Sequence, residues 1–278
     1  MDVRVGDTIA TVMRNTPVDQ LETRMLIGQV TQLTRVQLIT HAERAFSADE
    51  AARLNDLFQR RIAGEPVAYL LGEREFFGLR FQVDPAVLIP RPDTELLVEL
   101  ALQHLPQHGR VLDMGTGSGA IAIAIAHTRS DVKVTALDVS DKALLVAQAN
   151  AKHHQVDVEF LRSDWFAALD GQQFDLIVSN PPYIVAGDRH LSEGDLRFEP
   201  IDALTDHADG LSALRTISQY AHAHLADGGW LLMEHGYDQA EDVRDLLVAN
   251  DFTEVQSWRD LANIERVSGG KKSRAEDR

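Results

Sequence analysis

The chain contains no cysteine among its 278 residues. Disulfides and zinc sites built from thiolates are therefore excluded. Basic residues are scarce beside acidic ones, since 27 Lys and Arg stand against 43 Asp and Glu, for a formal net charge of −16. A surplus of negative charge disfavours nonspecific binding to nucleic acid phosphates. We therefore expect no direct nucleic acid partner.

Long hydrophobic runs are also absent. No apolar stretch approaches the roughly 20 residues that a membrane-spanning helix needs, and the first residues, Met1 to Arg4, lack the pattern of a signal peptide. We expect a cytoplasmic protein with no membrane association, and we take it to be a monomer. The 11 histidines show no metal-ligand spacing, so we expect no metal site.

The residues that are present are typical of a globular protein of about two domains. Hydrophobic residues make up 44% of the chain and charged residues 25%. Residues 1–72 carry apolar side chains at spacings of three and four, the period of amphipathic helices. Ser47 and Glu50 form the pattern of a capping box before one such stripe, and Gly64 ends it. We predict a helical N-terminal domain over residues 1–72.

Beyond residue 72, short aromatic and β-branched runs around Gly78 predict a β-hairpin linker over residues 73–92. From residue 93 to 268, strand patterns alternate with helical ones, as a parallel α/β sheet requires. The expected strands are 111–113, 132–138, 156–161, 174–179, 230–234, 253–258 and a piece near residue 266. The last two are too close for a crossover helix, so we expect an antiparallel pair at the sheet edge. Residues 269–278 are polar, and we predict a disordered tail.

A glycine-rich turn follows the first of these strands, in the sequence Asp113-Met114-Gly115-Thr116-Gly117-Ser118-Gly119. Glycine permits a sharp turn from strand to helix and lets the backbone approach a ligand closely. The spacing Gly-x-Gly-x-Gly differs from the Gly-x-Gly-x-x-Gly that is more typical of dinucleotide sites. Taken alone, the turn is either a tight turn without a ligand or a ligand site of another kind.

The stretch Asn180-Pro181-Pro182-Tyr183 directly follows the apolar strand at 174–179. Each proline fixes its own φ and pushes the preceding residue into extended geometry, so we expect the oxygens of Asn180 and Pro181 to face one direction. Those two carbonyls can accept the two N–H groups of a planar nitrogen. Such acceptors stabilise the positive charge that develops when this nitrogen takes up a methyl group. We predict that Asn180, Pro181, Pro182 and Tyr183 are catalytic, with Tyr183 placed to stack on the planar target.

Together, the glycine turn and this motif predict methyl transfer from S-adenosylmethionine, with S-adenosylhomocysteine as product. Asp138 ends the second strand, where its carboxylate can accept hydrogen bonds from both ribose hydroxyls. Asp164 can accept from the adenine amino group, and Trp165 is either plain core or a wall against the adenine ring. Asp113 either caps the turn or lies near the methionine amino group. The expected cofactor residues are Asp113, Gly115, Thr116, Gly117, Ser118, Gly119, Asp138, Asp164, Trp165 and Asn180.

Longer motifs extend this pattern over nearly the whole chain: Gly64-Glu65-Pro66, Tyr69 to Gly72, Phe76 to Leu79, Ile89 to Glu95, Asp113 to Gly119, Ser179 to Ile184, Phe198 to Pro200, Ala203-Leu204 and Glu234 to Gly236. With these motifs the chain resembles the HemK/PrmC family of methyltransferases, although Met114 stands where leucine is usual, a change that conserves volume. The resemblance implies an α/β fold, in which a seven-stranded, Rossmann-like class I methyltransferase domain follows an N-terminal helical bundle that helps to hold the protein substrate. It also implies methylation of the side-chain amide nitrogen (N5) of the glutamine in the Gly-Gly-Gln motif of peptide chain release factors, a step that supports translation termination.

Three other functions fit parts of the pattern. An adenine-N6 methyltransferase of DNA or RNA uses a similar motif, but base flipping requires a basic surface, and Arg60-Arg61 is the only adjacent basic pair in the N-terminal segment. A noncatalytic adaptor would not need the intact Asn180 to Tyr183 motif, and a nicotinamide dehydrogenase would leave it unexplained. The sequence does not place residues 185–196, whose length and polarity suit a lid.

Overall fold

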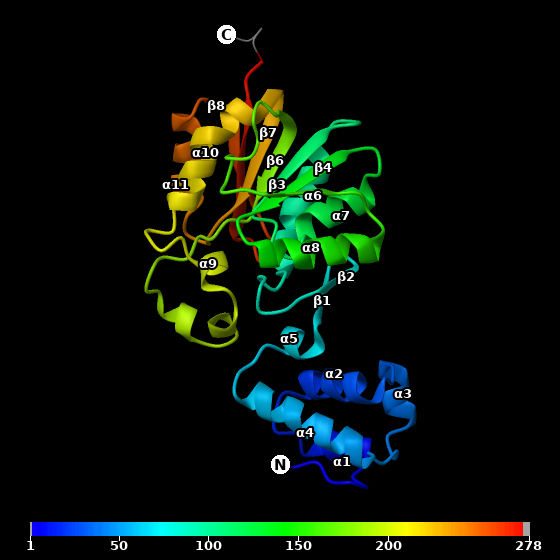
Figure 1. Cartoon of the computed structure of the whole chain (residues 1–278). Helices are drawn as coiled ribbons and strands as arrows, with labels where there is room; N and C mark the ends of the chain where they lie inside the picture. The colour runs from blue at the N-terminus through cyan, green and yellow to red at the C-terminus, as the bar shows by residue number, and fades with distance from the viewer. Residues whose placement is uncertain (1, 275–278) are drawn as a thin grey trace. The chain divides into compact units, whose positions relative to one another are not determined.

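The computed structural model describes residues 2–274, and the chain divides into two compact units between Glu73 and Arg74. The first unit is helical, as the apolar spacing predicts (Figure 1). Its helices are α1 (Ile9–Arg14), α2 (Gln20–Thr31), α3 (Arg35–Thr40), α4 (Ala48–Ile62) and α5 (Val67–Leu71). Their apolar faces enclose one core, in which Leu26, Leu54 and Phe58 are almost fully buried. Burial of these faces stabilises helices that would be marginal in isolation.

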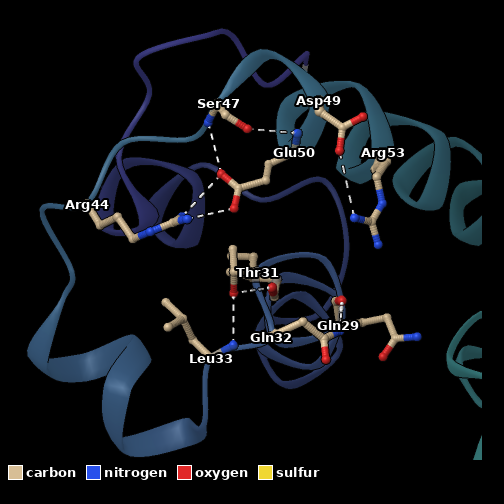
Figure 2. A network of polar contacts seen from close by, with 10 residues as sticks. Gln29, Thr31, Gln32, Leu33, Arg44, Ser47, Asp49, Glu50 and Arg53 are labelled. Carbon is tan, nitrogen blue, oxygen red and sulfur yellow. Dashed lines mark hydrogen bonds and ion pairs between the residues drawn. The ribbon is translucent and has the colours of Figure 1, made fainter.

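The start of α4 confirms the predicted capping box (Figure 2). The Glu50 backbone N–H donates to Ser47 Oγ at 3.2 Å, and the Ser47 N–H donates to Glu50 Oε2 at 2.9 Å. Arg44 adds a salt bridge of 2.6 Å to the same carboxylate, and its hydrogen bond holds the pKa of Glu50 below its ordinary value. A cap of this kind stabilises a helix by about 1 kcal/mol.

The second unit is built on a seven-stranded sheet with the order β5-β4-β3-β6-β7-β9-β8. Its strands are β3 (Arg110–Met114), β4 (Lys133–Asp138), β5 (Glu159–Arg162), β6 (Phe174–Ser179), β7 (Leu225–Glu234), β8 (Phe252–Arg259) and β9 (Glu265–Lys272). The first five are parallel, whereas β9 lies antiparallel between β7 and β8. The seven strands and the antiparallel pair at the edge confirm the predicted fold class.

Helices cover both faces of this sheet (Figure 1). Successive strand residues point to opposite faces, so Val111 packs in one core cluster and Leu112 in the other. One face is covered by α6 (Glu95–His104), α7 (Ala120–Thr128) and α8 (Asp141–His154), and the other by α10 (Ser212–His224) and α11 (Ala240–Ala249). The unit also contains the short 3₁₀ helices η1 (Pro92–Thr94), η2 (Arg189–Ser192) and η3 (Leu196–Phe198) and the short α-helix α9 (Ile201–Leu204). No helix within residues 2–274 is long and apolar enough to cross a membrane.

The predicted hairpin is present as β1 (Glu73–Phe76) and β2 (Leu79–Gln82). Phe77 and Gly78 occupy its turn with positive φ of 52° and 74°, the geometry that favours glycine at such positions. Asn150 of α8 ties the hairpin to the glycine turn. Its Oδ1 accepts from the Gln82 N–H at 2.7 Å, and its Nδ2 donates to the backbone oxygens of Gln82 and Ser118 at 3.0 and 2.9 Å.

Two sequence-based expectations are wrong in detail. The third strand begins at Glu159 rather than Val156, because the Val156 N–H donates to Ala151 O and closes the end of α8. The predicted disordered tail also begins too early, since β9 continues to Lys272. Gly269 and Gly270 pack so closely that an added Cβ would lie 2.6 Å from Leu231 O and 2.8 Å from Phe252 Cβ respectively. Glycines give no hydrophobic signal, so their burial is invisible in the sequence; residues 275–278 lie outside the described part.

Candidate active site

The glycine turn joins β3 to α7 at the carboxyl end of the sheet. Gly115 N and Thr116 N both donate to Leu137 O at 2.9 Å, which anchors the turn to β4. Gly115 and Gly117 have positive φ of 71° and 55°, and an added Cβ at either would have no atom within 4 Å. The backbone there faces open space. This is the arrangement that lets a ligand approach peptide groups directly.

Other residues of the turn support it from beneath. An added Cβ at Gly119 would lie 2.8 Å from Ile123 Cδ1 and 3.2 Å from Ala147 Cβ, so glycine permits the close approach of α7 and α8. The Thr116 hydroxyl donates to Asp113 Oδ2 at 2.6 Å, and Ser118 is buried. The predicted cofactor residues Thr116, Ser118 and Gly119 therefore shape the turn.

Asp113 is fully buried below the turn. Its Oδ2 accepts from the Thr116 hydroxyl and from the Ala122 N–H at 3.2 Å, so the carboxylate does hold the turn as a cap would. Its Oδ1 is buried and has no hydrogen-bond partner among residues 2–274. Burial raises the pKa of Asp113 to about 7, and the nearby Asp138 adds to the rise. An orphaned acceptor at this depth suits a donor group brought by a ligand.

A cavity of about 280 Å³ opens above the turn, at the carboxyl ends of the parallel strands. Ligands of open α/β sheets bind at this edge. The cavity brings together seven of the residues that the sequence predicts. They are Gly115, Gly117, Asp138, Asp164, Trp165, Asn180 and Pro182.

Asp138 is a carboxylate of the cavity wall that two backbone N–H groups hold in place. Its Oδ2 accepts from the Gly117 N–H and its Oδ1 from the Ser140 N–H, each at 2.9 Å. Each carboxylate oxygen retains a further lone pair, so the group can still accept from a ligand hydroxyl. Burial raises the pKa of Asp138, while the backbone hydrogen bonds oppose the rise.

Trp165 serves as core and as cavity wall. Its ring packs against the apolar cluster beneath β6 and β7, and it also lines the cavity. Its φ of 47° is unusual for an indole-bearing residue. Ser163 holds this turn, because its hydroxyl donates to Trp165 O at 2.7 Å and accepts from Ala168 N at 3.0 Å. Asp164 is exposed at the rim of the same cavity.

The residues of the Asn180 to Tyr183 motif do not all line the same cavity. Asn180 and Pro182 line the cavity, whereas Pro181 is buried. Asn180 Nδ2 donates to Thr94 Oγ1 at 3.2 Å. Tyr183 lines a neighbouring cavity of about 360 Å³, and its hydroxyl donates to Glu234 Oε1 at 3.4 Å. The tyrosine ring thus lies apart from the cavity that holds the Asn180 side chain.

Residue-by-residue inspection of the sequence missed a second wall of the cavity, made by residues 86–88 and by Pro200, Asp202 and Ala203. Glu199, whose side chain is fully buried, joins these two segments. It accepts from the Ile89 N–H at 3.0 Å and forms a salt bridge with Arg91. Part of this wall could have been found, because Pro200 and Ala203 belong to motifs noted above only for their resemblance, whereas residues 86–88 and Asp202 belong to none.

Glu234 was likewise unassigned. It ends β7, is only 2% exposed, and burial raises its pKa to about 7. The hydroxyl of Tyr183 donates to its carboxylate and favours the charged form, and the Thr94 hydroxyl also lowers the pKa. Burial and the Glu234 charge raise the pKa of Tyr183 in turn, which keeps its hydroxyl protonated.

The chain is similar to known proteins over most of its length. Residues 11–72 match the PrmC N-terminal domain, and residues 92–193 match the methyltransferase small domain. A release factor glutamine methyltransferase of Burkholderia pseudomallei is 53% identical over 273 residues, covering 95% of this chain and 96% of that protein. One from Neisseria gonorrhoeae is 52% identical over 254 residues, covering 91% and 93%. A methyltransferase structure from Pyrococcus furiosus shares the fold, with a TM-score of 0.55 at 18% identity over 77% of this chain and 97% of that one.

Proposed function

This chain belongs to the family of release factor glutamine methyltransferases, and we propose that it methylates the side-chain amide nitrogen (N5) of a glutamine in peptide chain release factors. The target glutamine is the one in the Gly-Gly-Gln motif, so the reaction supports translation termination. The proposal includes a cytoplasmic location, a monomer, and a substrate-recognition role for residues 1–72, joined by the hairpin linker at 73–92 to a methyltransferase domain that begins at residue 93 and includes β9 up to Lys272.

The residues around the cavity suit S-adenosylmethionine as methyl donor. Gly115 and Gly117 offer open backbone, Asp138 keeps lone pairs for ribose hydroxyls, and Trp165 supplies an apolar wall for the adenine. Asp164 can accept from the adenine amino group at the rim. The buried Oδ1 of Asp113, which has no hydrogen-bond partner among residues 2–274, is an acceptor for the methionine amino group. When bound, this cofactor supplies an electrophilic methyl group on a sulfonium sulfur.

The single observation that carries the choice of target is the orientation of Asn180. Its amide NH2 is engaged by Thr94, which leaves its Oδ1 as an acceptor on the cavity wall. A glutamine carboxamide offers two N–H donors, one for Asn180 Oδ1 and one for the backbone oxygen of Pro181. Pro182 limits the freedom of that oxygen, because a residue before proline is held extended.

The two acceptors promote the chemistry by their placement. They would hold the amide nitrogen with its lone pair directed at the methyl group and stabilise the positive charge that the nitrogen gains as the C–N bond forms and the methyl–sulfur bond breaks, with S-adenosylhomocysteine as the leaving group. The nitrogen then loses one proton, which passes to water, and the amide is restored with one methyl in place of one hydrogen. No strong base is required, because the proton becomes acidic only after transfer.

Methyl transfer from labelled S-adenosylmethionine tests this function. The acceptors are a release factor, the same factor with its Gly-Gly-Gln glutamine replaced, duplex DNA and RNA. We expect label on the intact factor alone. Label on nucleic acid would favour the adenine-N6 alternative, and label on the glutamine-replaced factor would refute the assigned target.

A further inference from the structure

The Asn180 to Tyr183 motif has few backbone groups that can hold it in place, because its two central residues are prolines. Proline has no N–H, so neither of them donates a backbone hydrogen bond. The start of the motif is held by the sheet. Ser179, the last residue of β6, pairs with Met114 of β3, and its hydroxyl donates to Met114 O at 2.8 Å. The other end, at Tyr183, needs a separate support.

Gln239 holds that other end. It directly precedes α11 and is only 8% exposed. Its Nε2 donates to Tyr183 O at 3.1 Å and to Gly210 O at 3.2 Å. Its Oε1 accepts from the Gly236 N–H at 2.8 Å. One side chain therefore joins three segments, which are the motif, the turn before α10 and the turn after β7.

The backbone around the Gln239 amide allows it only one orientation. A side-chain amide has two donor hydrogens and one oxygen, and here both hydrogens and the oxygen are engaged. Turning the amide over would place its oxygen against two carbonyl oxygens and its NH2 against a backbone N–H. Such mismatches are costly in a buried place, because little water is there to replace the lost partners. The amide therefore fixes the carbonyl of Tyr183 in one position.

Close packing limits any movement of the same carbonyl. An added Cβ at Gly210 would lie 2.6 Å from Tyr183 O and 2.9 Å from Gln239 Nε2, so the turn before α10 lies directly against the motif. Asp206 supports this turn, since its Oδ1 accepts from the N–H groups of Ala208 and Gly210 at 2.9 and 3.0 Å. The end of the motif thus rests on a turn that is itself held by hydrogen bonds.

We propose that Gln239 is a positioning residue for methyl transfer, which clamps the Tyr183 carbonyl and thereby keeps the acceptors of the motif in place. The acceptors are Asn180 Oδ1 and Pro181 O, so this inference rests on the function proposed for them. The prolines between the two held ends fix their own φ and transmit position along the motif. Release of Tyr183 O would let the acceptors shift, and a shift of about 1 Å can lower the rate of an oriented reaction by about a hundred-fold.

Glutamate and methionine at position 239 test the clamp. Gln239→Glu keeps the size and the acceptor for the Gly236 N–H, but it places a second oxygen against two carbonyl oxygens. Gln239→Met keeps the length and removes all three hydrogen bonds. We expect each to lower kcat by about ten- to a hundred-fold. The affinity for S-adenosylmethionine should be unchanged, because Gln239 lines the neighbouring cavity and not the one above the glycine turn.

The matched control is Asn250→Asp, at the other end of the same helix. Asn250 closes α11, and its Nδ2 donates to Leu246 O at 2.8 Å. The substitution likewise puts a carboxylate oxygen where an amide donated to a backbone oxygen. Negative charge at the C-terminal end of a helix is destabilising, so we expect a lower melting temperature with wild-type kcat. A rate loss that only reflected a weakened α11 would appear in this variant too.

A double substitution separates positioning from general structural support. If Gln239 acts through the Asn180 acceptor, its loss should matter less where that acceptor is already gone. In the double variant Asn180→Ala, Gln239→Glu, the combined loss of kcat should fall short of the product of the two single losses by at least about three-fold. Structural damage unrelated to the acceptors would instead multiply the two losses.

The proposal is supported by lower kcat in both Gln239 variants, unchanged cofactor affinity, wild-type kcat in Asn250→Asp and a combined loss smaller than the product. Wild-type kcat in the Gln239 variants overturns it. A parallel fall in cofactor affinity, an equal rate loss in Asn250→Asp or a fully multiplied loss in the double variant also overturns it.

Gly210→Ala decides if neither Gln239 variant folds, as judged by its melting curve. Its methyl would press on Tyr183 O, so kcat should fall with cofactor affinity unchanged, and a wild-type kcat would overturn the proposal. A wild type that labels no release factor refutes the proposed function and the inference together. An active wild type with unaffected variants refutes only the inference.

Discussion

Replacement by alanine should have different effects at two glycines of the same turn, lowering stability at Gly119 and cofactor affinity at Gly117. At Gly119 the backbone has a φ of 83°, and the new methyl would meet Ile123 Cδ1 at 2.8 Å, Ala147 Cβ at 3.2 Å and Ala147 Cα at 3.3 Å. The isoleucine end can move, but the alanine and its backbone cannot readily do so. Left-handed backbone costs about 1–2 kcal/mol for a residue with a Cβ, and overpacking adds about 1–2 kcal/mol.

We therefore expect Gly119→Ala to lower the free energy of unfolding by about 2–4 kcal/mol. Gly117→Ala is the matched comparison. Its φ of 55° is the mildest of the three turn glycines, and its Cβ would meet no protein atom within 4 Å. Its stability cost should be about 1 kcal/mol. Because Gly117 lines the cavity, the added methyl should instead weaken cofactor binding by about ten-fold or more.

Urea unfolding and titration with S-adenosylmethionine measure both quantities on the same samples. The free energy of unfolding should be highest for the wild type, lower for Gly117→Ala and lowest for Gly119→Ala. When binding is measured on folded protein, the loss of affinity for S-adenosylmethionine should be larger for Gly117→Ala than for Gly119→Ala. Equal stability losses in the two variants would refute the packing role of Gly119. Wild-type affinity in Gly117→Ala would show that the ligand does not approach the turn at that point.

Further perturbations address other parts of the site. Asn180→Ala should keep cofactor affinity and lose about 10²–10³ in kcat, and an equal collapse of affinity would contradict the division of roles. Glu199→Ala should lower the unfolding free energy by about 3–5 kcal/mol in urea, because Arg91 and the Ile89 N–H lose a buried partner; a loss below 1 kcal/mol would contradict this. The pKa of Asp113 is about 7 in the folded protein, above its ordinary value of 3.8. The contribution of Asp113 to the free energy of unfolding is therefore full below about pH 4 and declines as the pH rises to 7. The stability advantage of wild type over Asp113→Asn should therefore shrink by on the order of 4 kcal/mol across this window, and a constant difference would refute it.

Periodicity and local turn chemistry determined much of the fold. The capping box at Ser47, the apolar run of the strand at 174–179 and the glycines of the turn at 115–119 each form a pattern within a few residues of sequence, although the tertiary structure also holds the strand and the turn. For the same reason the sequence predicts that Asp138 and Asn180 lie at the same edge of the sheet. Each directly ends or follows a parallel strand, and the carboxyl ends of such strands meet.

The order of the elements, the family motifs and the residues at the strand ends can therefore be read from the sequence. The pairing of the buried groups behind them depends on how the chain folds. Thr94 and Asn180 are 86 residues apart, and Ile89 and Glu199 are 110 residues apart. The buried glycines of β9, the orphaned Oδ1 of Asp113 and the raised pKa of Glu234 likewise follow from chain segments that are distant in sequence. Burial and hydrogen-bond satisfaction depend on everything around a group, so no local pattern of residues can specify them.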